Sequence, residues 1–88
     1  MGFLGMDPLA IRHLSRQLDT QSVEVETASA RLDTLFEELP WAGRDRERFL
    51  EEWRGDLAPR MRRASALLRE ASREAQRSAE DQNRASRS

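Results

Sequence analysis

Apolar residues recur along residues 8–39 in alternating steps of three and four. They are Ile11, Leu14, Leu18, Val25, Ala28, Leu32, Leu35 and Leu39, and Gln21 fills the one gap in the series. This spacing is typical of a helix with one apolar stripe and of a heptad seam between helices. Asp7 and Pro8 suit a helix start, because aspartate accepts hydrogen bonds from free first-turn amides and proline has the required φ. The pattern predicts a first helix over residues 8–39.

A second apolar stripe follows the only cluster of proline and glycine between two periodic segments, Pro40–Gly43. Its members are Phe49, Trp53, Leu57, Met61, Ala64, Leu68, Ala71, Ala75 and Ala79. Because proline and glycine interrupt helices and favour turns, the pattern predicts a turn over residues 40–44 and a second helix over residues 45–79. Asp45 is a candidate cap for this second helix.

Pro59 interrupts the second stripe. It lacks a backbone N–H, and its ring crowds the carbonyl of Gly55, so we expect a kink at residues 55–59. The alternative is a helix that ends near Arg54 and restarts after Ala58, which would give three helices.

The expected fold class is all-α, an antiparallel two-helix hairpin, because a connection this short places the two helices side by side. Residues 7–79 form its single domain, preceded by a flexible N-terminus at residues 1–6. Residues 80–88 are expected to be a polar flexible tail, since Ala85 is their only apolar residue.

The apolar surface is wider than a two-helix seam can cover. Four large apolar residues lie at the shoulders of the stripes: Phe36, Trp41, Leu50 and Leu67. A chain of 88 residues without cysteine cannot compensate with disulfides. We therefore expect the hairpin to pack against a second hairpin as a four-helix bundle. The alternative is a monomeric hairpin with exposed apolar residues.

The charges favour helix pairing and disfavour other partners. Residues 1–43 hold three arginines and seven acids, and residues 44–88 hold twelve arginines and nine acids, while the net charge is -1. Opposite charges on the two arms favour their antiparallel pairing. A nearly neutral chain is not expected to bind nucleic acid, and without an apolar run of about 20 residues it is not expected to span a membrane.

The chain has few residues that could carry catalysis. His13 is the only histidine, and cysteine and tyrosine are absent. His13 has no second histidine or carboxylate cluster at metal-ligand spacing, and no serine has a neighbouring base. We expect a protein that is not an enzyme and that holds no metal or cofactor.

Trp41-Ala42-Gly43 stands in the predicted turn, and Phe49 and Trp53 lie one helical turn apart soon after it. Gly43 permits a positive φ, and Trp41 offers a large flat surface at the hairpin tip. Trp41 either fills the end of the core or serves in recognition. With its length and hairpin layout, the chain resembles the WXG family, the early-secreted-antigen-like small helical hairpins of type VII secretion systems, over nearly its whole length.

The resemblance implies a secreted or co-secreted partner that dimerises and is recognised through the Trp-x-Gly turn, here Trp41 and Gly43. It also implies that the complex engages the secretion-system ATPase. Family members often carry a Tyr-x-x-x-Asp/Glu signal after the second helix, which this chain lacks. A heterodimer with another small helical-hairpin protein is therefore favoured, and a homodimer is the alternative.

Thirteen residues are predicted to form the core or the interface. They are Ile11, Leu14, Leu18, Val25, Leu32, Leu35, Phe36, Leu39, Phe49, Trp53, Leu57, Met61 and Leu68. The expected localisation is secreted without a cleavable signal peptide, or cytoplasmic before export. Two other functions fit the pattern: a targeting or chaperone-like helical partner of a larger secreted toxin or effector, and a cytoplasmic coiled-coil adaptor.

Overall fold

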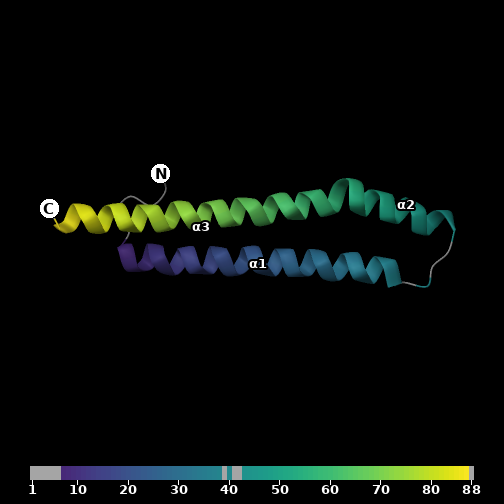
Figure 1. Ribbon diagram of the computed structural model, residues 1–88, viewed down its shortest axis with the longest axis horizontal. Helices are drawn as coiled ribbons and strands as arrows, with labels where there is room; N and C mark the ends of the chain where they lie inside the picture. The colour runs from purple at the N-terminus through teal and green to yellow at the C-terminus, as the bar shows by residue number, and fades with distance from the viewer. Residues whose placement is uncertain (1–6, 39, 41–42, 88) are drawn as a thin grey trace.

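A computed structural model describes residues 7–38, 40 and 43–87 of the chain. Its helices are α1, Pro8–Glu38, α2, Arg44–Glu52, and α3, Ala58–Arg87, and a π-helical segment, Trp53–Leu57, joins α2 to α3. α1 lies alongside the rod formed by α2 and α3 and runs in the opposite direction (Figure 1). The molecule measures 67 × 18 × 13 Å. The predicted all-α helical hairpin is confirmed.

Both helix starts follow from local backbone chemistry. Asp7 Oδ1 accepts a hydrogen bond from the Leu9 amide at 3.1 Å, and α1 begins at Pro8 as the sequence predicts. α2 begins at Arg44, directly after Gly43, whose φ is 84°. The predicted positive φ is therefore confirmed, but the proposed Asp45 cap is wrong, because Asp45 lies within the first turn of α2.

The proline in the second arm produces one turn of π-helix. The Ala58 amide donates to the Trp53 carbonyl, five residues earlier, immediately before Pro59. A π-turn absorbs one extra residue without breaking the helix. The expected irregularity near residues 55–59 takes this form, and the alternative of a helix that ends near Arg54 does not occur.

The seam between the arms is a regular heptad pattern of buried and half-buried residues. On α1 its members are Ile11, Ser15, Leu18, Ser22, Val25, Ser29, Leu32 and Phe36. On α3 they are Ala58, Met61, Ser65, Leu68, Ser72, Ala75, Ala79 and Gln82. Steps of three and four alternate throughout both series, which is the periodicity of a coiled coil.

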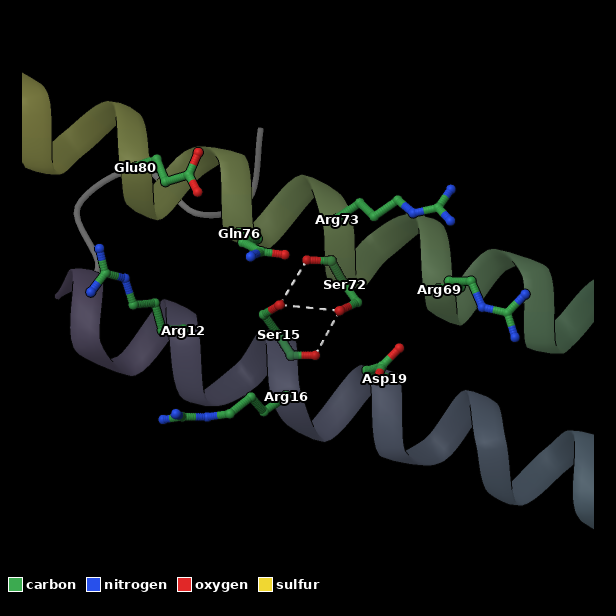
Figure 2. Close-up of a pocket in the computed structure, with 9 residues that line it drawn as sticks. All are labelled: Arg12, Ser15, Arg16, Asp19, Arg69, Ser72, Arg73, Gln76 and Glu80. Atoms are coloured by element: carbon green, nitrogen blue, oxygen red, sulfur yellow. Dashed lines mark hydrogen bonds between the residues drawn. The ribbon is translucent and has the colours of Figure 1, made fainter.

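Serine side chains connect the two helix backbones across this seam. Ser15 Oγ donates to the Ser72 carbonyl at 2.9 Å, and Ser72 Oγ donates to the Ser15 carbonyl at 2.7 Å (Figure 2). Ser65 Oγ donates to the Ser22 carbonyl at 3.0 Å in the same way. A short side chain reaches the opposite backbone only where the helices approach closely, so these pairs mark the tightest part of the hairpin.

The predicted stripes need correction by one position in each helix. Ile11, Leu18, Val25 and Leu32 lie in the seam as predicted, but Leu14, Ala28 and Leu35 lie beside it, and Leu35 is 52% exposed. In the second arm Trp53, Met61 and Leu68 are correctly placed. Phe49 and Leu57, in contrast, are 39% and 40% exposed, while their neighbours Leu50 and Ala58 are buried.

The physical reason for the shift is that the buried serines satisfy their hydroxyl groups on backbone carbonyls. Ser15, Ser65 and Ser72 do so across the seam, and Ser22 donates to the Asp19 carbonyl of its own helix. No buried side-chain polar atom in the described part of the chain lacks a hydrogen-bond partner. Burying a satisfied serine therefore avoids the cost of burying an unsatisfied polar group. In the second arm the π-turn adds a further cause, because the buried residues step by five from Trp53 to Ala58.

The C-terminal end of the chain is helical beyond the predicted domain. α3 is helical to Arg87, whereas residues 80–88 were expected to be a flexible tail. The predicted N-terminal segment 1–6, Leu39 and Trp41 lie outside the described residues.

Candidate functional site

The two sides of the seam differ in chemistry. Arg12, Asp19, Glu26 and Asp33 each directly follow a seam residue of α1, and Arg62, Arg69 and Gln76 do so on α3. We call these seven residues the charged flank. Glu26 and Arg69 form an ion pair across it, which shows that the two helices contribute to the same side.

The opposite side is mostly apolar. Its residues each directly precede a seam position: Leu14, Ala28 and Leu35 on α1, and Leu57, Ala64 and Ala71 from the second arm. We call these six residues the apolar flank. In an antiparallel helix pair, positions on the same side of both seams face each other, so these six residues share one side of the hairpin. Gln21 and Ser78 occupy the same heptad positions and interrupt the apolar series. Leu67, three residues after Ala64, is 64% exposed and widens the apolar flank.

The apolar flank contains two residues that the sequence pattern had assigned to the buried stripes. The sequence predicts Leu35 and Leu57 to be core or interface residues, and the structure places both beside the core, exposed in the single hairpin. Contiguous exposed apolar surface is typical of a protein interaction site. Their role as interface residues stays a prediction.

Glu26 is the best-connected group of the charged flank. Its carboxylate accepts a hydrogen bond from Arg69 and lies 3.1 Å from Ser65 Oγ, whose single proton is shared between Glu26 and the Ser22 carbonyl. The hydrogen bond from Arg69, followed by that from Ser65, lowers the pKa of Glu26 below its ordinary value, because both stabilise the charged form.

An aromatic cluster closes the turn end of the hairpin. The ring of Phe36 packs edge-on against Phe49 and Trp53, with centroid separations of 4.9 and 5.0 Å. Trp53 is 2% exposed, and its indole Nε1 donates to Asp33 Oδ1 at 3.1 Å. Arg54 pairs with Glu37 at 2.9 Å, so α1 and the π-turn are held together beside the turn.

The predicted recognition turn is only partly within the described residues. Gly43 is exposed and has a positive φ, with φ 84° and ψ -156°. A Cβ at Gly43 would meet no atom within 4 Å, so the glycine is required by its dihedral angles and not by crowding. The recognition role of Trp41 and Gly43 stays a prediction.

The serines are the structural residues that the sequence-based reasoning missed. Ser15, Ser22 and Ser29 recur every seven residues, and so do Ser65 and Ser72. Each lies one place after a predicted stripe position, so a search for heptads of small residues would have found them. The serine series was overlooked because Leu18, Val25 and Leu32 complete a regular stripe either with the serines or with the residues that directly precede the serines.

The described residues hold no site for a metal. Among them no three histidine, cysteine, aspartate or glutamate side chains gather where they could bind an ion. His13 is exposed on α1. In the described part of the chain, no helix combines the length and the apolar character needed to cross a membrane.

Comparison with known proteins was made by sequence and by structure. No protein-family model matches the sequence, and no curated protein matches it either. In structure, the hairpin is similar to EsxA of Geobacillus thermodenitrificans, with a TM-score of 0.82 and 28% sequence identity. The match covers 97% of each of the two chains. The resemblance that the Trp-x-Gly motif indicated is therefore supported over nearly the whole chain, and the fold is a WXG-type helical hairpin.

Proposed function

We propose that this protein is a non-enzymatic WXG-type substrate, or co-secreted partner, of a type VII secretion system. The observation that carries the proposal is the similarity to EsxA over 97% of both chains. The proposed activity is assembly: the hairpin joins a second helical hairpin in a four-helix bundle, and the complex is presented to the secretion ATPase.

The apolar flank supports the dimerisation step. Leu35 and Leu57 are 52% and 40% exposed in the single hairpin, although both sit at regular heptad positions beside the seam. Burying such a strip against a second hairpin removes apolar area from water, which is the main favourable term in association. A second hairpin would cover it along its full length.

The partner is proposed to be a different chain. The chain contains no tyrosine, so it cannot supply the tyrosine-based export signal that the WXG resemblance implies. A heterodimer partner would contribute that signal, while this chain contributes the turn with Trp41 and Gly43.

A secretion assay tests the proposal. The tagged chain is expressed with a second small helical-hairpin protein, the candidate partner, in cells with and without an active type VII machinery. The amounts of the chain in the culture supernatant and in the cell pellet are then compared. We expect export only with the active machinery. Trp41→Ala is expected to reduce export while the helix content of the purified complex, measured by circular dichroism, stays unchanged.

Two results would contradict the proposal. Equal amounts in the supernatant with and without the machinery would exclude export by this route. Loss of helix content in Trp41→Ala together with loss of export would assign Trp41 to the core and not to recognition. A matched substitution of an exposed residue on the charged flank, Arg62→Ala, serves as the export control.

A further inference from the structure

A polar groove runs along the charged flank near the N-terminal half of α1. It has a volume of about 540 Å³ and is lined by Arg12, Ser15, Arg16, Asp19, Arg69, Ser72, Arg73, Gln76 and Glu80. Every lining residue is polar or charged, and four of the nine are arginines. The paired serines lie between the two helices, and the arginine side chains extend away from them, Arg12 and Arg16 on one side and Arg69 and Arg73 on the other (Figure 2).

Three of the four arginines are free to bind another group. Arg69 pairs with Glu26. Arg12, Arg16 and Arg73 form no ion pair or hydrogen bond with the described residues, and all three are exposed. The groove also contains two carboxylates, Asp19 and Glu80, so its arginines outnumber its acids by two.

The neighbouring groove on the same flank is different. It lies near the turn end and is lined by two acids, two arginines and apolar residues including Ala58 and Met61. Its formal charges balance, and Arg54 there is already paired with Glu37. The first groove, lined by four arginines and two carboxylates, is therefore the more positive of the two, and we call it the arginine groove.

We propose that the arginine groove binds an acidic helical segment of a partner protein. Arg12 and Arg16 are four residues apart on α1, and Arg69 and Arg73 are four residues apart on α3. Four residues of helix rise about 6 Å, so Arg12 and Arg16 repeat positive charge on α1 at that interval. On α3, where Arg69 is paired with Glu26, Arg73 adds the unpaired charge. A helix with glutamate or aspartate once per turn repeats its negative charge at the same interval, and each carboxylate can accept charge-assisted hydrogen bonds from arginine.

The chemistry of the groove favours this occupant over a nucleic acid. No aromatic side chain lines the groove, so bases have nothing on which to stack. The net charge of the chain is -1, so outside the groove it has no overall positive charge to attract a long polyanion. The site lies on the side of the seam opposite the apolar flank, so it is independent of the proposed dimer interface.

Fluorescence anisotropy with a synthetic peptide tests the proposal. The probe is a labelled alanine-rich helical peptide with glutamate at every fourth position, titrated with the full chain at low salt. In the double variant Arg12→Gln/Arg73→Gln we expect the Kd to rise at least about fivefold, because two exposed charge pairs are lost. Added salt is expected to weaken binding to the unchanged protein.

The control has the same change in net charge. Arg31→Gln/Arg63→Gln removes two exposed arginines, one from α1 and one from α3, that do not line the groove. Its Kd is expected to change by less than about twofold. Arg16→Gln alone, with a smaller expected loss, replaces the double variant if circular dichroism shows that the latter has lost helix.

Three outcomes would overturn the proposal. The first is that the peptide does not bind at low salt. The second is that the control variant loses as much affinity as the groove variant, which would mean that overall charge alone attracts the peptide. The third is tighter binding of a duplex oligonucleotide than of the peptide, which would make the groove a nucleic-acid surface. None of these outcomes bears on export by a secretion system.

Discussion

At the scale of single residues, small polar side chains occupy seam positions where the apolar stripes predict larger apolar ones. Ser15, Ser65 and Ser72 each donate a hydrogen bond to a carbonyl on the facing helix. These carbonyls can accept a second hydrogen bond, because each oxygen has two lone pairs. Serine is therefore suited to these positions by both size and chemistry.

Substituting Ser72 separates these two contributions. Ser72→Ala keeps the size and removes the hydroxyl, so we expect the free energy of unfolding to fall by about 1 kcal/mol. Ser72→Leu adds volume to the tightest part of the seam, and we expect a loss of about 1–3 kcal/mol despite its greater hydrophobicity. Urea denaturation measures both, with Thr20→Leu on the exposed face of α1 as the size control. A stabilised Ser72→Leu would show that the helices have room to spare.

Glu26 makes the stability depend on pH. The folded protein lowers its pKa through Arg69 and Ser65, so the folded state favours the ionised form more than the unfolded chain does. This contribution is fully present above the ordinary glutamate pKa and is lost as the pH falls through the lower folded value. In urea denaturation we expect Glu26→Gln to be less stable than the unchanged protein at neutral pH, and the difference to close in acid. Glu24→Gln, an exposed neighbour, should show no such closing difference.

At the scale of elements, the second arm shows how one proline changes a helix pattern. Its buried positions step by three from Leu50 to Trp53, by five to Ala58 and by three to Met61. The step of five is the π-turn. It rotates α2 relative to α3. Regular steps of four and three before Ala58 would bury positions 54 and 51, whereas the structure buries Trp53 and Leu50.

The two described glycines of this arm give opposite predictions for the same substitution. Neither would crowd an added Cβ, but Gly43 has φ 84° and Gly55 lies within the π-turn without a positive φ. We expect Gly55→Ala to raise the free energy of unfolding by about 0.5–1 kcal/mol, because alanine restricts the unfolded chain. Gly43→Ala should lower it by about 1–3 kcal/mol through backbone strain. Thermal unfolding followed by circular dichroism compares the two, and a change of the same sign in both would contradict this explanation.

Sequence reasoning reached the elements and missed the details of their contact. The start of α1, the hairpin, the turn glycine and the irregularity before Pro59 all follow from local chemistry, and each is present. The predicted Asp45 cap of the second helix is not. The predicted seam was displaced by one position at both places. Leu14 is more hydrophobic than its neighbour Ser15, and Leu35 fits an apolar stripe as well as its neighbour Phe36 does. Only the carbonyl on the facing helix makes Ser15 a core residue, and a single helix pattern does not contain that partner.

At the scale of the whole molecule, the hairpin presents unlike surfaces on the two sides of one seam. The apolar flank suits burial against another hairpin, and the charged flank keeps exposed arginines. A rod only 13 Å thick in its narrowest direction has no deep core of its own. On the proposed assembly, we expect its stability to depend on the hairpin that covers the apolar flank.

Two exposed residues of matched accessibility test this dependence. Leu35 on the apolar flank is 52% exposed, and Val23, which is not part of it, is 51% exposed. We expect Leu35→Glu to weaken assembly with the partner hairpin at least about tenfold, because the interface would bury an unpaired charge. Val23→Glu should leave assembly within about twofold of the unchanged protein, since that position stays in water. Light scattering over a concentration series gives both constants, and equal effects would move the interface away from the apolar flank.

The serine pairs also carry an ambiguity that the chain connection and the turn-end contacts resolve. Ser15 lies opposite Ser72 and Ser22 opposite Ser65. Sliding α3 by one heptad would bring Ser72 opposite Ser22 and Ser65 opposite Ser29, so the ladder nearly repeats itself and does not alone define which residues meet. The connection at residues 39–43 and the Trp53–Asp33 hydrogen bond select one of the two alignments. A hairpin cut within that connection would keep the Trp53–Asp33 hydrogen bond and the aromatic contacts of Phe36 as the means of distinguishing the two alignments, so the covalent connection and the turn-end contacts share that task.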